Sequence, residues 1–286
     1  MAAASRREPA HQDGPADPAP DDDLGTAASR NGHVPESRAR RDSDSAPPQA
    51  GIRDLIAAYP WLPVVLGLLL SALGVWCFTG LTEQVYQGGP LVRLDEHLLR
   101  VSLGLRSGLL VGALAVLTWL GDVLVVLPLS LAIGVLIGVT RHRWSPLVLL
   151  ALSSAGTGLA VYLIKIMIAR PRPLVVDAVV VEDGFGFPSG HSAHAAALYL
   201  MLGAFALRLL RTRWARNALF TAAVLAIVIT GFSRVMLGVH SPTDVLAGWT
   251  LGASWTVLLL SLWLFAEHLP RLIDSLVARK RRASGD

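Results

Sequence analysis

Long apolar segments, most of them close to the length that crosses a lipid bilayer, recur along the chain between residues 62 and 265. A membrane-spanning helix needs about 20 apolar residues, and lipid offers no partner for an open backbone, so such segments fold as helices. The candidates are Leu62–Leu81, Leu109–Val139, Pro146–Ile168, Ala193–Leu209, Ala218–Arg234 and Val245–Phe265. The pattern predicts an all-α, polytopic membrane bundle of about six transmembrane helices.

The second of these segments is too long for one simple span. We expect a long, tilted helix over Leu109–Val139 that continues outside the bilayer. Gly121 and Asp122 interrupt its apolar character. A re-entrant break at Gly121 is therefore the alternative.

The composition differs along the chain. Charged residues make up 16% of it, against about 25% in average soluble domains. Residues 1–50, however, are rich in Ala, Pro, Asp, Ser and Arg and contain no aromatic residue, which predicts a disordered tail. We therefore expect a disordered cytoplasmic tail over 1–50, a membrane-integral domain over 51–270 and a basic cytoplasmic tail over 271–286.

The basic residues indicate the orientation in the membrane. The stretches RHRW, RLLRTRWAR and RLIDSLVARKRR follow the second, fourth and sixth apolar segments. The positive-inside rule places these stretches and both termini in the cytoplasm. Connections 82–107, 169–191 and 235–244 then face outward from the cell membrane, and Thr82–Ser107 is expected to form an amphipathic helix at that surface. Membrane topology thus explains the net charge of +4 without nucleic acid.

The outward connections carry charged residues beside apolar spans, where charges are costly and usually functional. KIMIARPRP ends the third span with Lys165, Arg170 and Arg172. SRVMLGVHSPTD joins the last two spans with Arg234 and His240. Any one of these cations is explained equally well as a snorkelling anchor. Taken together, Arg and Lys side chains from separate connections favour a phosphate site.

The turn PSGH lies between two apolar runs and opens the fourth span. Ser189 suits the N-cap of that helix. Free backbone N–H groups at a helix N-terminus also bind anions, and Gly190 allows a ligand to approach closely. The turn therefore predicts a phosphate cradle with His191 at its rim.

The stretch HSPTD also begins a helix. Ser241, Pro242 and Asp244 have the pattern of a capping box, which does not account for His240. Because His240 and Asp244 are four residues apart, the carboxylate can reach the imidazole. It would fix the tautomer and leave the other ring nitrogen as a better nucleophile.

Two other residue types have ordinary explanations. His194 is interpreted as a packing or pocket-lining residue, and a zinc site from His191 and His194 is disfavoured by the nearby cations. The single cysteine, Cys77, lies inside an apolar run and is interpreted as a small buried side chain.

The three clusters together resemble the type 2 phosphatidic acid phosphatase family, which shares a superfamily with vanadium-dependent haloperoxidases. The family has the ordered motifs K-x6-R-P, P-S-G-H and S-R-x5-H-x3-D. The chain matches them with Lys165 and Arg172-Pro173, with Pro188-Ser189-Gly190-His191, and with Ser233-Arg234, His240 and Asp244. The resemblance spans about Leu109–Phe265 and implies a membrane-integral, metal-independent phosphatase without a cofactor.

The resemblance also implies a role for each matched residue. His240 would attack phosphorus and form a phosphohistidine, and Asp244 would orient it. His191 would protonate the leaving group and then activate water. Lys165, Arg172 and Arg234 would neutralise the phosphoryl oxygens, helped by Ser189 and the Gly190 N–H.

The implied substrate is a phosphomonoester or diphosphate of a membrane lipid: phosphatidate, phosphatidylglycerophosphate, diacylglycerol pyrophosphate or a polyprenyl diphosphate. A lipid phosphotransferase that uses the same histidine is an alternative, and so is a non-catalytic lipid-binding membrane protein. A haloperoxidase is disfavoured by the apolar spans. A transporter or channel is disfavoured because the charges lie near span ends. The sequence does not indicate the oligomeric state.

Overall fold

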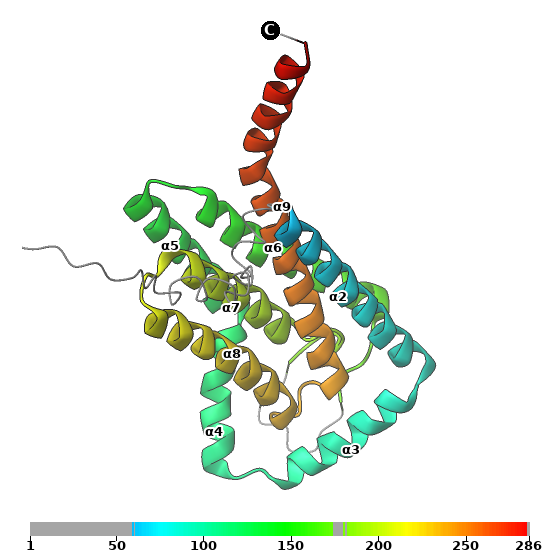
Figure 1. The fold of residues 1–286 in the computed structure, drawn as a ribbon. Coiled ribbons are helices and arrows are strands. Elements are labelled where there is room, and N and C mark those ends of the chain that lie inside the picture. The colour runs from blue at the N-terminus through cyan, green and yellow to red at the C-terminus, as the bar shows by residue number, and fades with distance from the viewer. Residues whose placement is uncertain (1–58, 60, 174–179, 181, 285–286) are drawn as a thin grey trace, which may run out of the picture. The chain divides into compact units, whose positions relative to one another are not determined.

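The computed structural model describes residues 59, 61–173, 180 and 182–284, and within them every element is helical. The elements are α2 (Leu62–Gln87), α3 (Pro90–Gly104), α4 (Gly108–Leu117), the 3₁₀ turn η1 (Thr118–Gly121), α5 (Val123–Arg141), α6 (Ser145–Ile168), α7 (Gly190–Leu209), α8 (Arg213–Met236) and α9 (Pro242–Ser284). Among the described residues, 6 helices are long and apolar enough to cross a membrane: α2, α5, α6, α7, α8 and α9 as far as Pro270. The expected helical membrane bundle is confirmed (Figure 1).

The predicted domain boundaries stay predictions. The expected tail over 1–50 lies outside the described residues. At the other end, α9 continues through Pro270 to Ser284 as one helix.

The expectation of a single long helix over Leu109–Val139 is wrong, because the chain breaks at Gly121 and Asp122. α4 passes into η1, Asp122 has extended backbone angles, and α5 starts at Val123. Close packing explains the break: a Cβ on Gly121 would lie 2.5 Å from the His191 carbonyl oxygen of α7. The Asp122 carboxylate accepts the Leu124 N–H at 2.8 Å and so caps α5.

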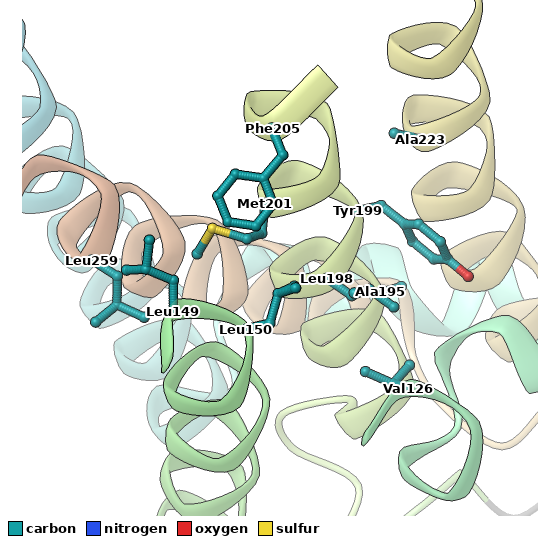
Figure 2. Packing of buried hydrophobic residues seen from close by; sticks show 10 residues of the cluster. All are labelled: Val126, Leu149, Leu150, Ala195, Leu198, Tyr199, Met201, Phe205, Ala223 and Leu259. Atoms are coloured by element: carbon teal, nitrogen blue, oxygen red, sulfur yellow. The ribbon is translucent and has the colours of Figure 1, made fainter. Parts of the chain in front are cut away.

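Helix α7 lies at the centre of the bundle. In α7, 67% of the most apolar stretch is buried, against 17% in α2. Figure 2 shows Leu198, Tyr199 and Met201 of α7 within the main apolar cluster, which also takes residues from α5, α6, α8 and α9. The Tyr199 hydroxyl donates to the Leu120 carbonyl at 3.0 Å. This hydrogen bond satisfies a backbone carbonyl at the break after α4.

Two glycines of α9 allow helices α7 and α9 to pack closely against each other. A Cβ on Gly248 would lie 2.5 Å from the Ser189 carbonyl oxygen, and one on Gly252 would lie 2.2 Å from that of Ala193. The Ser189 N–H also donates to the Asp244 carbonyl at 2.9 Å. This close approach brings the PSGH turn against the start of α9.

Helix α3 runs across one end of the bundle, at the bottom of Figure 1. It makes an angle of 118° with the following helical segment, Gly108–Gly121. Its leucines Leu94 and Leu98 are exposed, whereas Asp95 is buried at 3% exposure. The amphipathic helix expected within Thr82–Ser107 is therefore present over Pro90–Gly104, with an acidic side chain turned inward.

Basic residues gather at the end of the bundle where α7 finishes. Arg208 contacts Glu267 at 3.0 Å and stacks over the ring of Trp263 at 4.3 Å. Arg141 donates to the Leu209 carbonyl at 3.4 Å. The basic stretches after the second and fourth spans thus lie at the same end of the bundle, opposite the end of α7 that carries the PSGH turn.

Candidate active site

Four chain segments meet where α7 begins: the end of α6 with residues 170–173, the residues 182–189 before α7, the end of α8, and the start of α9. Together with the first two residues of α7, they carry all the site residues that the sequence predicted, namely Lys165, Arg172, Ser189, Gly190, His191, Arg234, His240 and Asp244.

His240 and Asp244 form a buried pair. His240 Nδ1 lies 3.4 Å from Asp244 Oδ2, and the same oxygen accepts the Ser241 N–H at 2.9 Å. Arg172 Nη1 lies 3.1 Å from His240 Nε2. Because a guanidinium has only donors, Nε2 accepts and the ring proton sits on Nδ1, facing Asp244. This tautomer leaves a lone pair on Nε2.

The charge state of His240 agrees with that tautomer. Burial lowers the pKa of His240 to about 4 and outweighs the opposing effect of Asp244. The imidazole is therefore neutral near pH 7, as a nitrogen nucleophile requires.

Arg172 and Arg234 hold a carboxylate between them. Arg172 Nη2 lies 2.9 Å from Glu182 Oε2, and Arg234 Nη2 contacts the other oxygen, Oε1. Arg234 is buried at 1% exposure and donates to Thr118 Oγ1 at 2.9 Å. Lys165 Nζ donates to the Phe185 carbonyl at 2.7 Å.

Glu182 is an anion in this arrangement. Burial alone would raise the pKa of its carboxyl, but Arg234 and then Arg172 hold that pKa at about 2. A carboxylate bound by two guanidinium groups has the charge and donor geometry of a bound phosphoryl group. The two arginines therefore form a site that holds both oxygens of an anionic group.

The PSGH turn caps α7 as expected. Ser189 Oγ accepts the Ser192 N–H at 3.5 Å and the Ser192 hydroxyl at 3.0 Å. Both contacts use Ser189 Oγ as an acceptor, so its own proton is free to be donated. Gly190 is the first residue of α7, and its N–H belongs to the free donors of the helix N-terminus.

His191 lies against the break between α4 and α5. Its Nε2 is 3.2 Å from Asp122 Oδ2, and both side chains are about one-fifth exposed, at 18% and 22%. A carboxylate at this distance can hold the imidazole in a fixed orientation. The interruption noted in the second apolar segment thus supplies a partner for His191.

The residues around the predicted site were not found by sequence reasoning. Asp122 carried a signal, since a charge inside an apolar run is costly. Glu182 and Thr118 carried none, because nothing local to them shows that they meet Arg234.

His194 is buried beside Gly158 of α6, as its packing interpretation expected.

We predict that Glu182→Gln tightens the binding of inorganic phosphate, measured by titration calorimetry, by about tenfold. Glutamine keeps the shape of the side chain but exchanges charge-assisted contacts for neutral ones, a difference of about 1.4 kcal/mol. Asp183→Asn is the matched control, because it removes an exposed charge from the same loop. Equal dissociation constants for phosphate in Glu182→Gln and wild type would show that Glu182 does not occupy an anion site.

An all-helical bundle with 6 candidate spans, in which cations surround an anion beside a histidine–aspartate pair, is a multi-pass membrane protein with an anion-binding centre. Residues 146–267 match the PAP2 superfamily. The chain belongs to this superfamily, and the resemblance indicated by its three motifs is confirmed.

Named relatives agree with that assignment. The chain is 34% identical over 160 residues to phosphatidylglycerophosphatase B of Bacillus subtilis (strain 168), covering 55% of this chain and 77% of the relative. It is 39% identical over 89 residues to undecaprenyl-diphosphatase of Sulfolobus acidocaldarius, covering 30% of this chain and 38% of the relative. The crystal structure of a transmembrane PAP2 type phosphatidylglycerolphosphate phosphatase from Bacillus subtilis matches with a TM-score of 0.62 and 29% identity, over 69% of this chain and 96% of that one.

Proposed function

We propose that the protein is an integral membrane phosphatase that removes the terminal phosphate from a phosphomonoester or diphosphate of a membrane lipid, through a phosphohistidine at His240. The observation that carries the proposal is the geometry of His240. Its Nε2 lies 3.1 Å from Arg172, its Nδ1 faces Asp244, and Arg172 also binds the Glu182 carboxylate at 2.9 Å. A nucleophilic nitrogen thus lies beside the place where an anion is bound.

In the first step, the terminal phosphoryl group takes the place of the Glu182 carboxylate between Arg172 and Arg234. His240 Nε2 forms a bond to phosphorus while the bond from phosphorus to the leaving oxygen breaks. His191 gives a proton to that oxygen. The Nδ1 proton stays on the ring, where Asp244 stabilises the positive charge of the phosphohistidine.

In the second step, His191 takes a proton from water as the water oxygen attacks phosphorus. The P–N bond breaks and inorganic phosphate leaves, which restores neutral His240 and protonated His191. Throughout, Arg172, Arg234 and Lys165 offset the negative charge of the transferring group, with donors from Ser189 and the Gly190 N–H. The positive charge that the reaction needs comes from side chains, so we propose that no metal takes part.

The location of the site suits a lipid headgroup. The helices that carry it begin or end at this level, with α6 ending at Ile168 and α7 and α9 beginning at Gly190 and Pro242. A phosphate at a membrane surface can therefore reach the site while its hydrocarbon tail stays in the bilayer. By the positive-inside rule, we propose that the basic end is cytoplasmic and that the site faces outward from the cell membrane.

The relatives suggest the substrates to test first. One is named for phosphatidylglycerophosphate and another for undecaprenyl diphosphate. We expect purified protein in detergent to release phosphate from phosphatidate, phosphatidylglycerophosphate or undecaprenyl diphosphate, and to do so in the presence of EDTA. Loss of release in EDTA would contradict the metal-free scheme. If no substrate released phosphate but a second lipid or a sugar became phosphorylated, the protein would be a phosphotransferase.

A further inference from the structure

Behind the His240–Asp244 pair lies a second layer of charged residues, Arg170 and Asp95. Arg170 belongs to the same ARPRP stretch as Arg172 but points elsewhere. Arg172 contacts His240 and Glu182, whereas Arg170 contacts the carboxylates of Asp244 and Asp95. The two arginines of this short stretch therefore contact different parts of the site.

Arg170 fixes the oxygen of Asp244 that does not face the histidine. Its Nη1 lies 2.5 Å from Asp244 Oδ1, while Asp244 Oδ2 faces His240. With Ser241 N–H on Oδ2 and Arg170 on Oδ1, the carboxylate is held at both oxygens. Asp244 therefore cannot rotate away from the imidazole without losing a charge-assisted hydrogen bond.

Asp95 in turn fixes Arg170. Arg170 Nη2 lies 3.0 Å from Asp95 Oδ2, and Arg170 Nη1 also donates to Thr243 Oγ1 at 2.8 Å. Asp95 Oδ1 accepts the Thr243 N–H at 2.9 Å, and Oδ2 accepts the Thr243 hydroxyl. Asp95 thus holds both the arginine and the first turn of α9, which carries Asp244.

Asp95 lies on the buried face of α3, where its carboxylate is almost entirely shielded from solvent. The helix exposes Leu94, Leu98 and Val101, and buries Asp95. Burying a carboxylate is costly unless it is paired and hydrogen-bonded. The contacts with Arg170 and Thr243 therefore account for the buried carboxylate of Asp95.

We propose that Arg170 and Asp95 are positioning residues of the phosphohistidine reaction proposed above, on which this inference rests. Asp95 holds Arg170, Arg170 holds Asp244, and Asp244 keeps the His240 proton on Nδ1 so that Nε2 carries the lone pair. Neither residue contacts the anion between Arg172 and Arg234. Helix α3 is thereby an integral part of the active site.

The expected kinetic effect follows from that chain of contacts. Arg170→Met and Asp95→Asn should lower kcat by about 10- to 100-fold, the usual cost of losing a partner that orients a reactive group. KM should stay near the wild-type value, because the anion-binding residues are intact. Arg170→Lys should restore part of kcat, since an ammonium keeps the charge but does not reproduce the two-sided contact.

A control separates positioning from the mere attachment of α3. Just beyond α3, Arg106 Nε donates to the Met236 carbonyl at 2.7 Å, so it also ties this part of the chain to α8. Arg106→Gln removes that tie without touching Asp95 or Arg170. We expect it to keep kcat close to wild type. Equal losses of kcat in Arg106→Gln and Asp95→Asn would overturn the proposal, as would wild-type kcat in Arg170→Met.

A second measurement does not depend on turnover. Nuclear magnetic resonance of protein with ¹⁵N-labelled histidine rings, with His240 assigned by its loss in His240→Ala, reports which ring nitrogen carries the proton. Arg172 still donates to Nε2 in both variants, so we expect the Nδ1–H form throughout, with a weaker Nδ1–H contact to Asp244 in Arg170→Met and Asp95→Asn, seen as an upfield shift of the Nδ1 proton. An Nδ1 proton resonance unchanged in both variants would refute positioning. A shifted resonance in the variants, together with a wild type that releases no phosphate, would support positioning and refute the proposed function.

Discussion

Replacing His240 with alanine is expected to reduce phosphate release by about 10⁵- to 10⁶-fold, the scale of losing a catalytic nucleophile. The variant keeps Arg172, Arg234 and Lys165, so it should still bind phosphate. It lacks the imidazole whose Nε2 lone pair faces Arg172 and whose Nδ1 faces Asp244. The loss should therefore fall on kcat, with little change in phosphate binding.

The measurement is rapid quenching with substrate labelled with ³²P in its terminal phosphate. Wild type should carry label on protein in a form that survives base and is lost in acid, as a phosphohistidine is, and His240→Ala should carry none. His142→Asn is the control histidine, because it lies at the basic end with a φ of 52° that asparagine tolerates. Full activity in His240→Ala, or label on another residue, would contradict the mechanism.

The pH dependence should reflect the buried state of His240. Because burial lowers its pKa to about 4, the nucleophile stays neutral throughout the range from pH 5 to 8 in which an unperturbed histidine titrates. The same shift affects stability. The unfolded chain binds a proton at this histidine as pH falls below the unfolded-state pKa of about 6.5, whereas the folded protein does not. The free energy of unfolding therefore decreases as pH falls below that value.

Sequence reasoning reached the predicted site because its signals are local. Serine is a favoured N-cap residue, as Ser189 is in α7. His240 and Asp244 are four residues apart, so their contact can be predicted locally. Their roles could be assigned by the family resemblance because each motif lies within a few residues. The order and apolarity of the spans likewise come from composition over about 20 residues.

What sequence reasoning missed depends on contacts between distant segments. Arg170 meets Asp95 across 75 residues and Asp244 across 74, and no local pattern shows which arginine of ARPRP faces the anion. The break at Gly121 was only an alternative, because it depends on the approach of α7 to within 2.5 Å of a Cβ at that position. Tertiary packing overrode a helical pattern that local propensity favoured.

Replacing His191 with alanine is expected to have an effect that depends on the leaving group. For a phosphomonoester, the departing oxygen is an alkoxide that needs a proton, and losing the general acid should slow P–O cleavage by up to about 10⁴-fold. For a diphosphate, the departing group is itself a phosphate, whose second pKa is about 6, so it leaves without a proton near neutral pH. Its cleavage should slow by about tenfold or less.

Both substrates nevertheless need His191 as the base in the second step. With the diphosphate, the variant should therefore form the phosphohistidine but fail to hydrolyse it. A quench experiment with matched monoester and diphosphate lipids should show labelled His240 accumulating with the diphosphate and little label with the monoester. Asp122→Asn, which weakens the partner of His191 without removing the imidazole, should show a smaller effect in the same direction. Equal slowing of P–O cleavage for both lipids would show that His191 binds phosphate rather than transferring a proton, because only proton transfer distinguishes the two leaving groups.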